Sequence, residues 1–145
     1  MKYFQTDFAF NLNINKYGCL WFQLMNIAEQ YTGHNFVHKT IRELYDSLVD
    51  KNIMDKDCYV NNHEKVLQDC LEVFDCHDKV TYSGAWYNDK ETDRKTWGDR
   101  FGMYMILQMR TKNGNGHFTS MHYDSYRPEI NFTNLISVRY YNIGV

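Results

Sequence analysis

A cysteine stands directly after a glycine and before a long apolar run, a position that suits thiol chemistry. The residues are Tyr17, Gly18 and Cys19, and the run after them predicts a helix. At a helix start, the unpaired backbone N–H groups and the positive end of the helix dipole both favour a thiolate over a thiol. Cys19 is therefore the candidate nucleophile.

A histidine next to a glycine-rich turn is the candidate base. His117 opens a predicted strand that closes on Asp124. A reactive thiolate needs a base within hydrogen-bonding reach and a third group that orients that base. We hypothesise that Cys19 and His117 meet in space and that Asp124 accepts the second ring N–H of His117. His122 and Asn131 are the weaker candidates for this third position.

An oxyanion forms when a thiolate attacks a carbonyl, and it needs hydrogen-bond donors. The backbone N–H of Cys19 is one candidate donor. Asn13, a short distance upstream, offers a side-chain amide, and Asn15 is its rival. Asn13 therefore joins Cys19, His117 and Asp124 as the predicted catalytic residues.

Three helices are predicted in the first half of the chain, and the first of them has to position Cys19. Apolar residues recur at helical spacing from about Gly18 to Tyr31, and Gly33 suits a left-handed cap. Thr40 followed by Glu43 matches a capping box, which predicts a second helix from Thr40. Asn61 or Asn62 predicts the N-cap of a third helix.

The second half of the chain is predicted to form strands, one of which carries His117. The predicted strand segments lie near Val80–Tyr82 and at Met103–Met109, 117–124 and 136–143. The polar segment 83–99 predicts a solvated loop or a short exposed helix, and 111–116 a hairpin turn. Helices followed by strands indicate an α+β fold, with N-terminal helices packed on a C-terminal antiparallel β-sheet meander.

Length and composition restrict the class of protein. The chain has 145 residues, which suits a single domain over 1–145, and its 43% hydrophobic content excludes a disordered chain. With a net charge of -2 and no long Lys/Arg run, we expect no nucleic-acid partner. We also expect no signal peptide, no membrane span and a cytoplasmic location, where the four cysteines stay reduced.

One group of cysteines and histidines raises the question of a metal site. These residues are Cys58, His63, Cys70, Cys76 and His77. Their spacing matches no common zinc arrangement, and Cys70 fits the apolar stripe of the third helix. We therefore expect no metal and no cofactor.

The layout resembles that of papain-like cysteine peptidases, especially small bacterial and phage versions. Tyr17-Gly18-Cys19, Asp57–Val60, Gly116–Phe118 and Tyr123–Tyr126 are also similar to an uncharacterised phage-associated family with that fold. The resemblance implies a papain-like fold and a Cys-His-Asp triad that hydrolyses a peptide or amide bond. Papain-like enzymes have a glutamine about six positions before the nucleophile, where this sequence has Asn13.

Three functions follow from these observations. The first is a phage-associated cysteine peptidase or amidase acting on a peptide or protein, in the host cytoplasm if phage-encoded. The second is a catalytically inactive protein of the same fold that binds and inhibits a host or defence protein, since tyrosines are favoured at interfaces. The third is a self-associating structural or accessory phage protein. The oligomeric state is left open.

Overall fold

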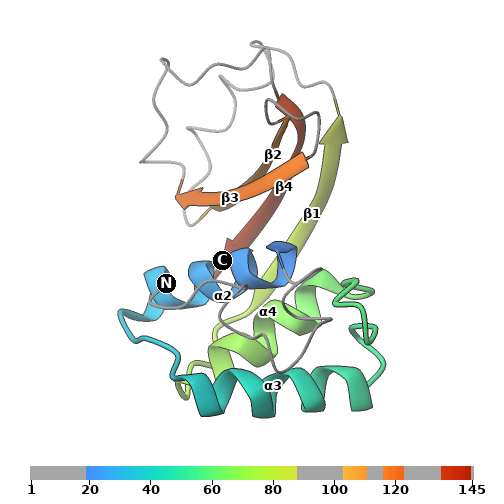
Figure 1. Cartoon of the computed structure of the whole chain (residues 1–145). Helices are drawn as coiled ribbons and strands as arrows, with labels where there is room; N and C mark the ends of the chain where they lie inside the picture. Colours follow the sequence, from blue (N-terminus) through green and yellow to red (C-terminus); the bar gives the residue numbers. More distant parts are fainter. Residues whose placement is uncertain (1–18, 88–102, 111–115, 123–134, 145) are drawn as a thin grey trace. The chain divides into compact units, whose positions relative to one another are not determined.

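The computed structural model describes residues 19–87, 103–110, 116–122 and 135–144. Within them, three helices precede a four-stranded antiparallel sheet, so the predicted α+β class is confirmed (Figure 1). The chain divides into two compact units, a helical unit over 1–78 and a sheet unit over 79–145. The division into units does not test the prediction that 1–145 is one domain, which stays a prediction.

Helix α2 (Cys19–Thr32) is the most apolar of the three described helices. It buries most of its circumference, as its two apolar stripes predicted, through Trp21, Phe22, Leu24, Met25, Ile27 and Ala28. Gly33 ends the helix with φ of 75°, and its N–H donates to the Glu29 carbonyl at 2.8 Å. The predicted left-handed cap is therefore confirmed. None of the described helices, α2 included, has both the length and the apolar composition needed to cross a membrane.

Helix α3 (His38–Asp50) begins before the predicted capping box, so that prediction is wrong. Val37 is the N-cap and makes no side-chain hydrogen bond, while Thr40 lies inside the helix. The start is set by Phe36, which is 1% exposed and whose N–H donates to the buried Glu29 carboxylate at 2.8 Å. Because this tertiary contact anchors the entering chain, no capping side chain is required.

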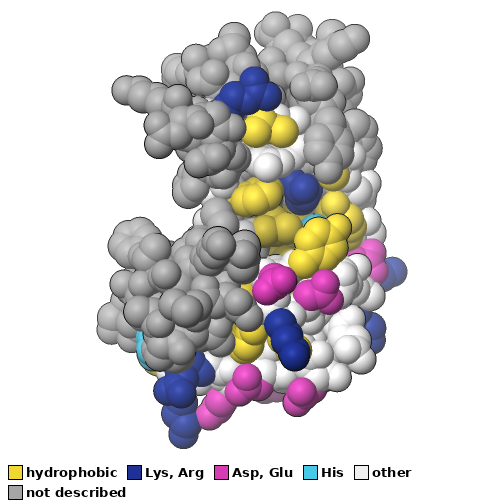
Figure 2. Space-filling view, turned by 45° about the vertical axis from the view of Figure 1, so that its right-hand side comes forward, with side chains coloured by type: hydrophobic (Ala, Val, Ile, Leu, Met, Phe, Trp, Pro, Cys, Tyr) yellow, Lys and Arg dark blue, Asp and Glu magenta, His cyan; other side chains and the backbone are white. Residues whose placement is uncertain are grey.

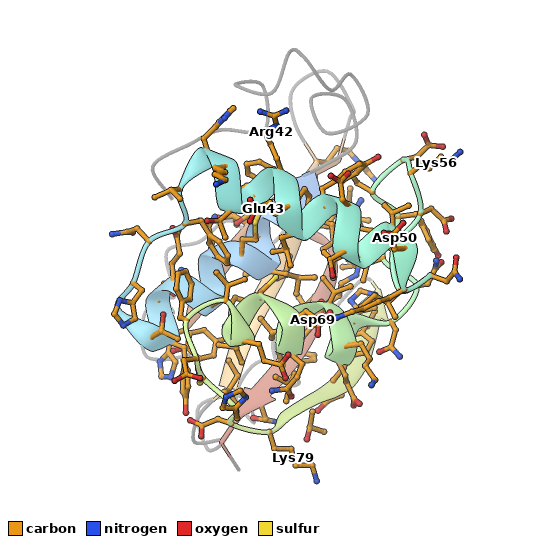
Figure 3. The ribbon with its side chains drawn as sticks, turned by 90° about the horizontal axis from the view of Figure 1, so that it is seen from below. Arg42, Glu43, Asp50, Lys56, Asp69 and Lys79 are labelled. Carbon is orange, nitrogen blue, oxygen red and sulfur yellow. The ribbon has the colours of Figure 1, made fainter. Side chains whose placement is uncertain are left out.

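Helix α3 is amphipathic. Ile41, Leu44, Tyr45 and Leu48 are buried on one face, as the helical spacing predicts. Charged side chains such as Arg42, Glu43 and Asp50 are exposed, and Figure 3 shows them along the same helix. The apolar face thus positions α3 within the helical unit, and the charged residues meet solvent.

Helix α4 (His63–Glu72) packs against both α2 and α3. Its predicted N-cap is confirmed, because the Asn62 side chain accepts from the Lys65 N–H at 3.1 Å. Its buried residues are Val66, Leu67, Cys70 and Leu71. This helix completes the core of the helical unit.

The sheet has the strand order β1-β4-β2-β3, and every neighbouring pair is antiparallel. The strands are β1 (Val80–Tyr87), β2 (Met103–Arg110), β3 (Gly116–His122) and β4 (Leu135–Ile143). A simple meander would place β3 beside β4, whereas β4 instead lies between β1 and β2. The interior place suits β4 because Val138 and Tyr140 are buried opposite Leu107 and Met105.

Strand β1 extends further than the sequence predicts. Residues 83–87 belong to the strand, whereas they were expected to start a solvated loop or exposed helix; residues 88–99 lie outside the described residues. Pairing with β4 explains the difference, since it satisfies backbone groups that the polar sequence suggested would meet water. The register of this pairing shifts by one residue between Tyr82 and Gly84, as at a β-bulge, and Gly84 has φ of 100° there.

Candidate functional site

Cys19 is the first residue of helix α2, where the sequence predicted a helix start. This is the end of the helix at which backbone N–H groups lack intrahelical partners. The backbone position therefore has the feature that thiolate chemistry requires, while the Cys19 side chain lies outside the described part of the structure.

His117 is the second residue of strand β3, and its backbone pairs with Met109 of β2. The strand that the sequence predicted for it is confirmed. Cys19 belongs to the helical unit and His117 to the sheet unit. Their meeting as nucleophile and base therefore stays a prediction.

The other predicted catalytic residues divide into two groups. Asn13 and Asp124, with the rivals Asn15 and Asn131, lie outside the described residues. His122 is described as the last residue of β3, where its ring meets the ring of Tyr104 edge-on at 4.8 Å between centroids. This contact gives His122 a packing role in the sheet unit.

Two cysteines of the helical unit are poor nucleophiles because they are buried. Burial, and secondarily the nearby Asp57 charge, raises the pKa of the Cys58 thiol to about 12. Burial also raises the pKa of Cys70, with Asp69 adding to the effect and the Trp21 side chain acting in the opposite direction. Both thiols stay protonated near neutral pH, so neither competes with Cys19 as a thiolate.

The next feature is the group of cysteines and histidines between Cys58 and His77. No group of three or more His, Cys, Asp or Glu residues that could hold a metal ion occurs among the residues the structure describes. Cys70 is fully buried in the α4 core, as its place in the apolar stripe predicted. Cys58 is buried in the preceding loop with φ of 62°.

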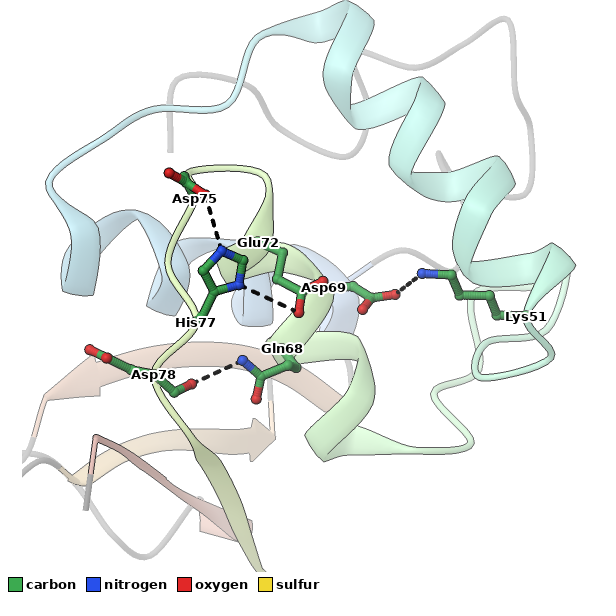
Figure 4. A network of polar contacts seen from close by, with 7 residues as sticks. All are labelled: Lys51, Gln68, Asp69, Glu72, Asp75, His77 and Asp78. Atoms are coloured by element: carbon green, nitrogen blue, oxygen red, sulfur yellow. Dashed lines mark hydrogen bonds and ion pairs between the residues drawn. The ribbon is translucent and has the colours of Figure 1, made fainter.

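His77 takes part in a surface network at the end of α4 (Figure 4). Its Nε2 lies 3.0 Å from an Asp75 carboxylate oxygen and its Nδ1 lies 4.0 Å from Glu72. The His77 side chain is 69% exposed and that of Asp75 is 96% exposed. Such exposed pairs contribute little free energy and mark a solvated turn rather than a catalytic group.

A partly buried polar cluster in the sheet unit was not predicted from the sequence. We call Gln108, Phe118, Ser137 and Arg139 the Arg139 cluster. Arg139 Nη1 donates to Ser137 Oγ at 2.8 Å, and Ser137 Oγ donates to Gln108 Oε1 at 2.9 Å. The Arg139 guanidinium carbon lies 5.2 Å from the centroid of the Phe118 ring.

The cluster forms because register brings its members to one face of the sheet. Gln108 pairs with both Ser137 and Phe118, while Ser137 and Arg139 are two residues apart on β4. In a strand, residues two apart share a face. The signal in the sequence was the alternation Ser137–Arg139 within an apolar strand, although only the strand order shows that Phe118 lies nearby.

Ser137 is 0% exposed, and the tyrosines Tyr104 and Tyr141 are 7% and 0% exposed. Burial raises the pKa of Tyr104, and burial together with Tyr82 raises the pKa of Tyr141 above its usual value, opposed by the Arg139 charge. Buried aromatic rings and the buried Ser137 thus lie near a half-buried guanidinium.

Comparison of the sequence with known proteins identifies the family of the chain. No curated protein and no solved structure matches it. One family model matches residues 1–121, which is most of the chain and includes Asn13, Cys19 and His117. The chain belongs to the family described as "Protein of unknown function, DUF261".

Proposed function

We propose that the protein is a phage-associated cysteine peptidase or amidase that acts in the cytoplasm on a peptide or protein. Cys19 is the nucleophile of a papain-like Cys-His-Asp triad. The observation that carries the proposal is that helix α2 begins at Cys19. The helix terminus supplies N–H groups and a positive dipole end, both of which stabilise a thiolate.

The other thiols of the chain support this assignment by contrast. The pKa values of Cys58 and Cys70 are raised by burial, which suppresses their thiolates. Cys76 is half-buried and lies in the turn after α4, away from any helix start. Cys19 is the cysteine whose local backbone favours the charged form.

The proposed reaction divides amide hydrolysis into two steps. The Cys19 thiolate attacks the carbonyl carbon, the C–N bond breaks, and the His117 imidazolium gives its proton to the leaving amine. His117 then takes a proton from water, which attacks the thioester and releases the acid and the Cys19 thiolate. Asp124 orients the His117 ring, and the Cys19 N–H with the Asn13 amide stabilises the oxyanion.

Differential labelling tests the nucleophile. We expect iodoacetamide at pH 7 to label Cys19 about tenfold faster than Cys76, because a larger thiolate fraction more than offsets the lower nucleophilicity of a low-pKa thiol. Cys58 and Cys70 should label more slowly than either. Mass spectrometry of digested samples gives the four rates. Variant Cys76→Ala is the matched control and should leave the Cys19 rate unchanged; equal rates at Cys19 and Cys76 contradict the proposal.

A non-catalytic binding role is the second candidate, favoured by Tyr59. This side chain is 69% exposed on a loop whose backbone is held by Tyr45 and by the bridge between Met54 and Val60. A fixed, exposed tyrosine suits a protein interface. Cys19→Ala separates the two functions, since it removes hydrolysis and leaves binding intact. Partner binding that survives Cys19→Ala and is lost in Tyr59→Ala supports this second role.

A further inference from the structure

We propose that the Arg139 cluster binds the carboxylate of an acidic peptide that pairs with the edge of the sheet at strand β3. The proposal rests on residues that the thiol chemistry does not use. It therefore stands or falls separately from the assignment of Cys19.

The Arg139 guanidinium is held in place by neutral groups. Its Nη1 donates to Ser137 Oγ at 2.8 Å, and Ser137 is in turn fixed by Gln108 at 2.9 Å. One face of the guanidinium lies near the Phe118 ring, with 5.2 Å between its carbon and the ring centroid. Among the described residues, Ser137 is its only hydrogen-bonding partner. The remaining N–H donors form the planar fork that carboxylates bind in two places.

The charges of the described strands favour an anion. The described strands contain no Asp or Glu, while they contain Arg110 and Arg139. In Figure 2, some Lys and Arg side chains lie beside Asp and Glu side chains, and others lie among hydrophobic ones. Arg139 is half-buried, and a half-buried charge without a counter-charge is costly. A carboxylate would remove that cost.

The position of the guanidinium indicates a peptide as the source of the carboxylate. Arg139 belongs to β4, but its side chain reaches Phe118 of β3, two strands away in the order β1-β4-β2-β3. Strand β3 is an edge of the described sheet, and an extended peptide can add to such an edge through backbone hydrogen bonds. An acidic side chain on that peptide would then meet the guanidinium.

A carboxylate fits better than a phosphate because of charge. One guanidinium neutralises one negative charge, and the buried neighbours Ser137, Tyr104 and Tyr141 are neutral. A phosphate carries close to two charges near neutral pH, and the second would remain uncompensated beside aromatic rings. The cluster therefore selects a monoanion on an extended chain.

The test is a titration of the full ¹⁵N-labelled chain, read by NMR at the Nε–Hε signals of Arg139 and Arg110. The probes are acetyl-Val-Glu-Val-amide, its Gln analogue and inorganic phosphate. We expect the Glu peptide to move the Arg139 signal saturably, and the Gln peptide and phosphate to bind about tenfold more weakly or not at all. Arg139→Lys keeps the charge without the fork and should weaken Glu-peptide binding about tenfold. The matched variant Arg110→Lys, at an exposed position, should leave it unchanged.

Four results would overturn the proposal. They are an unmoved Arg139 signal with the Glu peptide, an equal response to the Gln peptide, tighter binding of phosphate, and an equal loss in Arg110→Lys. A further control uses the protein alone between pH 7 and pH 3. If the Arg139 signal changes over the pH range in which carboxylates titrate, an Asp or Glu of this chain already binds the guanidinium. That result also overturns the proposal. The wild-type measurements remain decisive if Arg139→Lys fails to fold, which circular dichroism would detect.

Discussion

The helical unit and the sheet unit each bury one polar residue among those the structure describes, and they hold it differently: a backbone N–H donates to Glu29, whereas Ser137 is bonded to two side chains. In the helical unit, charged pairs such as His77–Asp75 and Lys39–Glu43 lie on the surface, and the interior is formed mainly by apolar side chains. In the sheet unit, Ser137 is fully buried and Arg139 is half-buried between neutral partners. Surface pairs contribute little free energy, whereas buried polar groups are costly to leave unpaired. The contact at Glu29 fixes the chain that enters α3, whereas the contacts at Ser137 fix a partly exposed side chain, Arg139, as a binding site requires.

Alkaline pH should produce the largest effect and act on both units. Burial raises the pKa of Cys58 from 9.0 to about 12 and the pKa of Tyr141 well above 10.0. The unfolded chain loses these protons first, so the free energy of unfolding should stay constant up to about pH 9 and then fall as pH rises towards 12. Urea unfolding between pH 8 and pH 12 measures the fall.

Variants at two tyrosines separate the contributions to this pH dependence. Tyr141→Phe removes one raised pKa, so stability should fall less steeply above pH 10. Tyr59→Phe, at a side chain that is 69% exposed, is the matched control and should keep the wild-type slope. Identical slopes for both variants contradict the assignment of the effect to Tyr141.

Leu67→Ala should give the next largest effect, in the apolar core of the helical unit. Leu67 is 0% exposed in α4, so its truncation should lower the free energy of unfolding by about 3 kcal/mol. Val37→Ala, at a side chain that is 56% exposed, should change it by less than about 0.5 kcal/mol. Denaturant unfolding measures both, and similar losses would mean that Leu67 is not a core contact.

Ser137→Ala tests the partly buried polar cluster of the sheet unit. The change leaves Gln108 Oε1 and Arg139 Nη1 without their shared partner, so we expect a loss of about 2 kcal/mol. Ser47→Ala, at a half-buried position of α3, is the control. It should change the free energy of unfolding by less than about 0.5 kcal/mol. A neutral Ser137→Ala would remove the contrast between the two units.

The smallest effect concerns the helix caps of the helical unit. Asn62→Ala should lower the free energy of unfolding by about 1 kcal/mol, because it removes the bond to the Lys65 N–H. Thr40→Ala should lower it by less than about 0.5 kcal/mol, since Thr40 lies inside α3 and caps nothing. Thermal unfolding of the two variants compares them. A larger loss at Thr40 than at Asn62 would contradict the structure and would support Thr40 as the N-cap of α3.

Much of the fold could be predicted because it depends on local patterns. The helical spacing of α2, the Asn62 cap, the Gly33 cap and the β2 strand are each carried by a few neighbouring residues. The start of α3 was mispredicted because a distant contact, Phe36 to Glu29, sets it. Local propensity gives way where tertiary contacts compete with it.

The two candidate sites also differ in how far they depend on neighbouring residues or on distant contacts. A helix start at Cys19 and a strand at His117 could be predicted, as each depends on nearby residues. Their meeting requires the relative placement of two units and stays a prediction, as does the role of Asp124 and Asn13. The Arg139 cluster could not be predicted, since its members come from three strands.

The sequence alone determined the helical character of the first half, the antiparallel strands of the second half, and the cysteine at the start of α2. These features depend on periodicity, turn residues and caps, which act over a few residues. Only the tertiary structure decided that β4 lies between β1 and β2. That insertion brings Ser137 and Arg139 beside Gln108 and within reach of Phe118. The physical reason is that strand order follows from burying two sheet faces at once, which no single segment of the chain encodes.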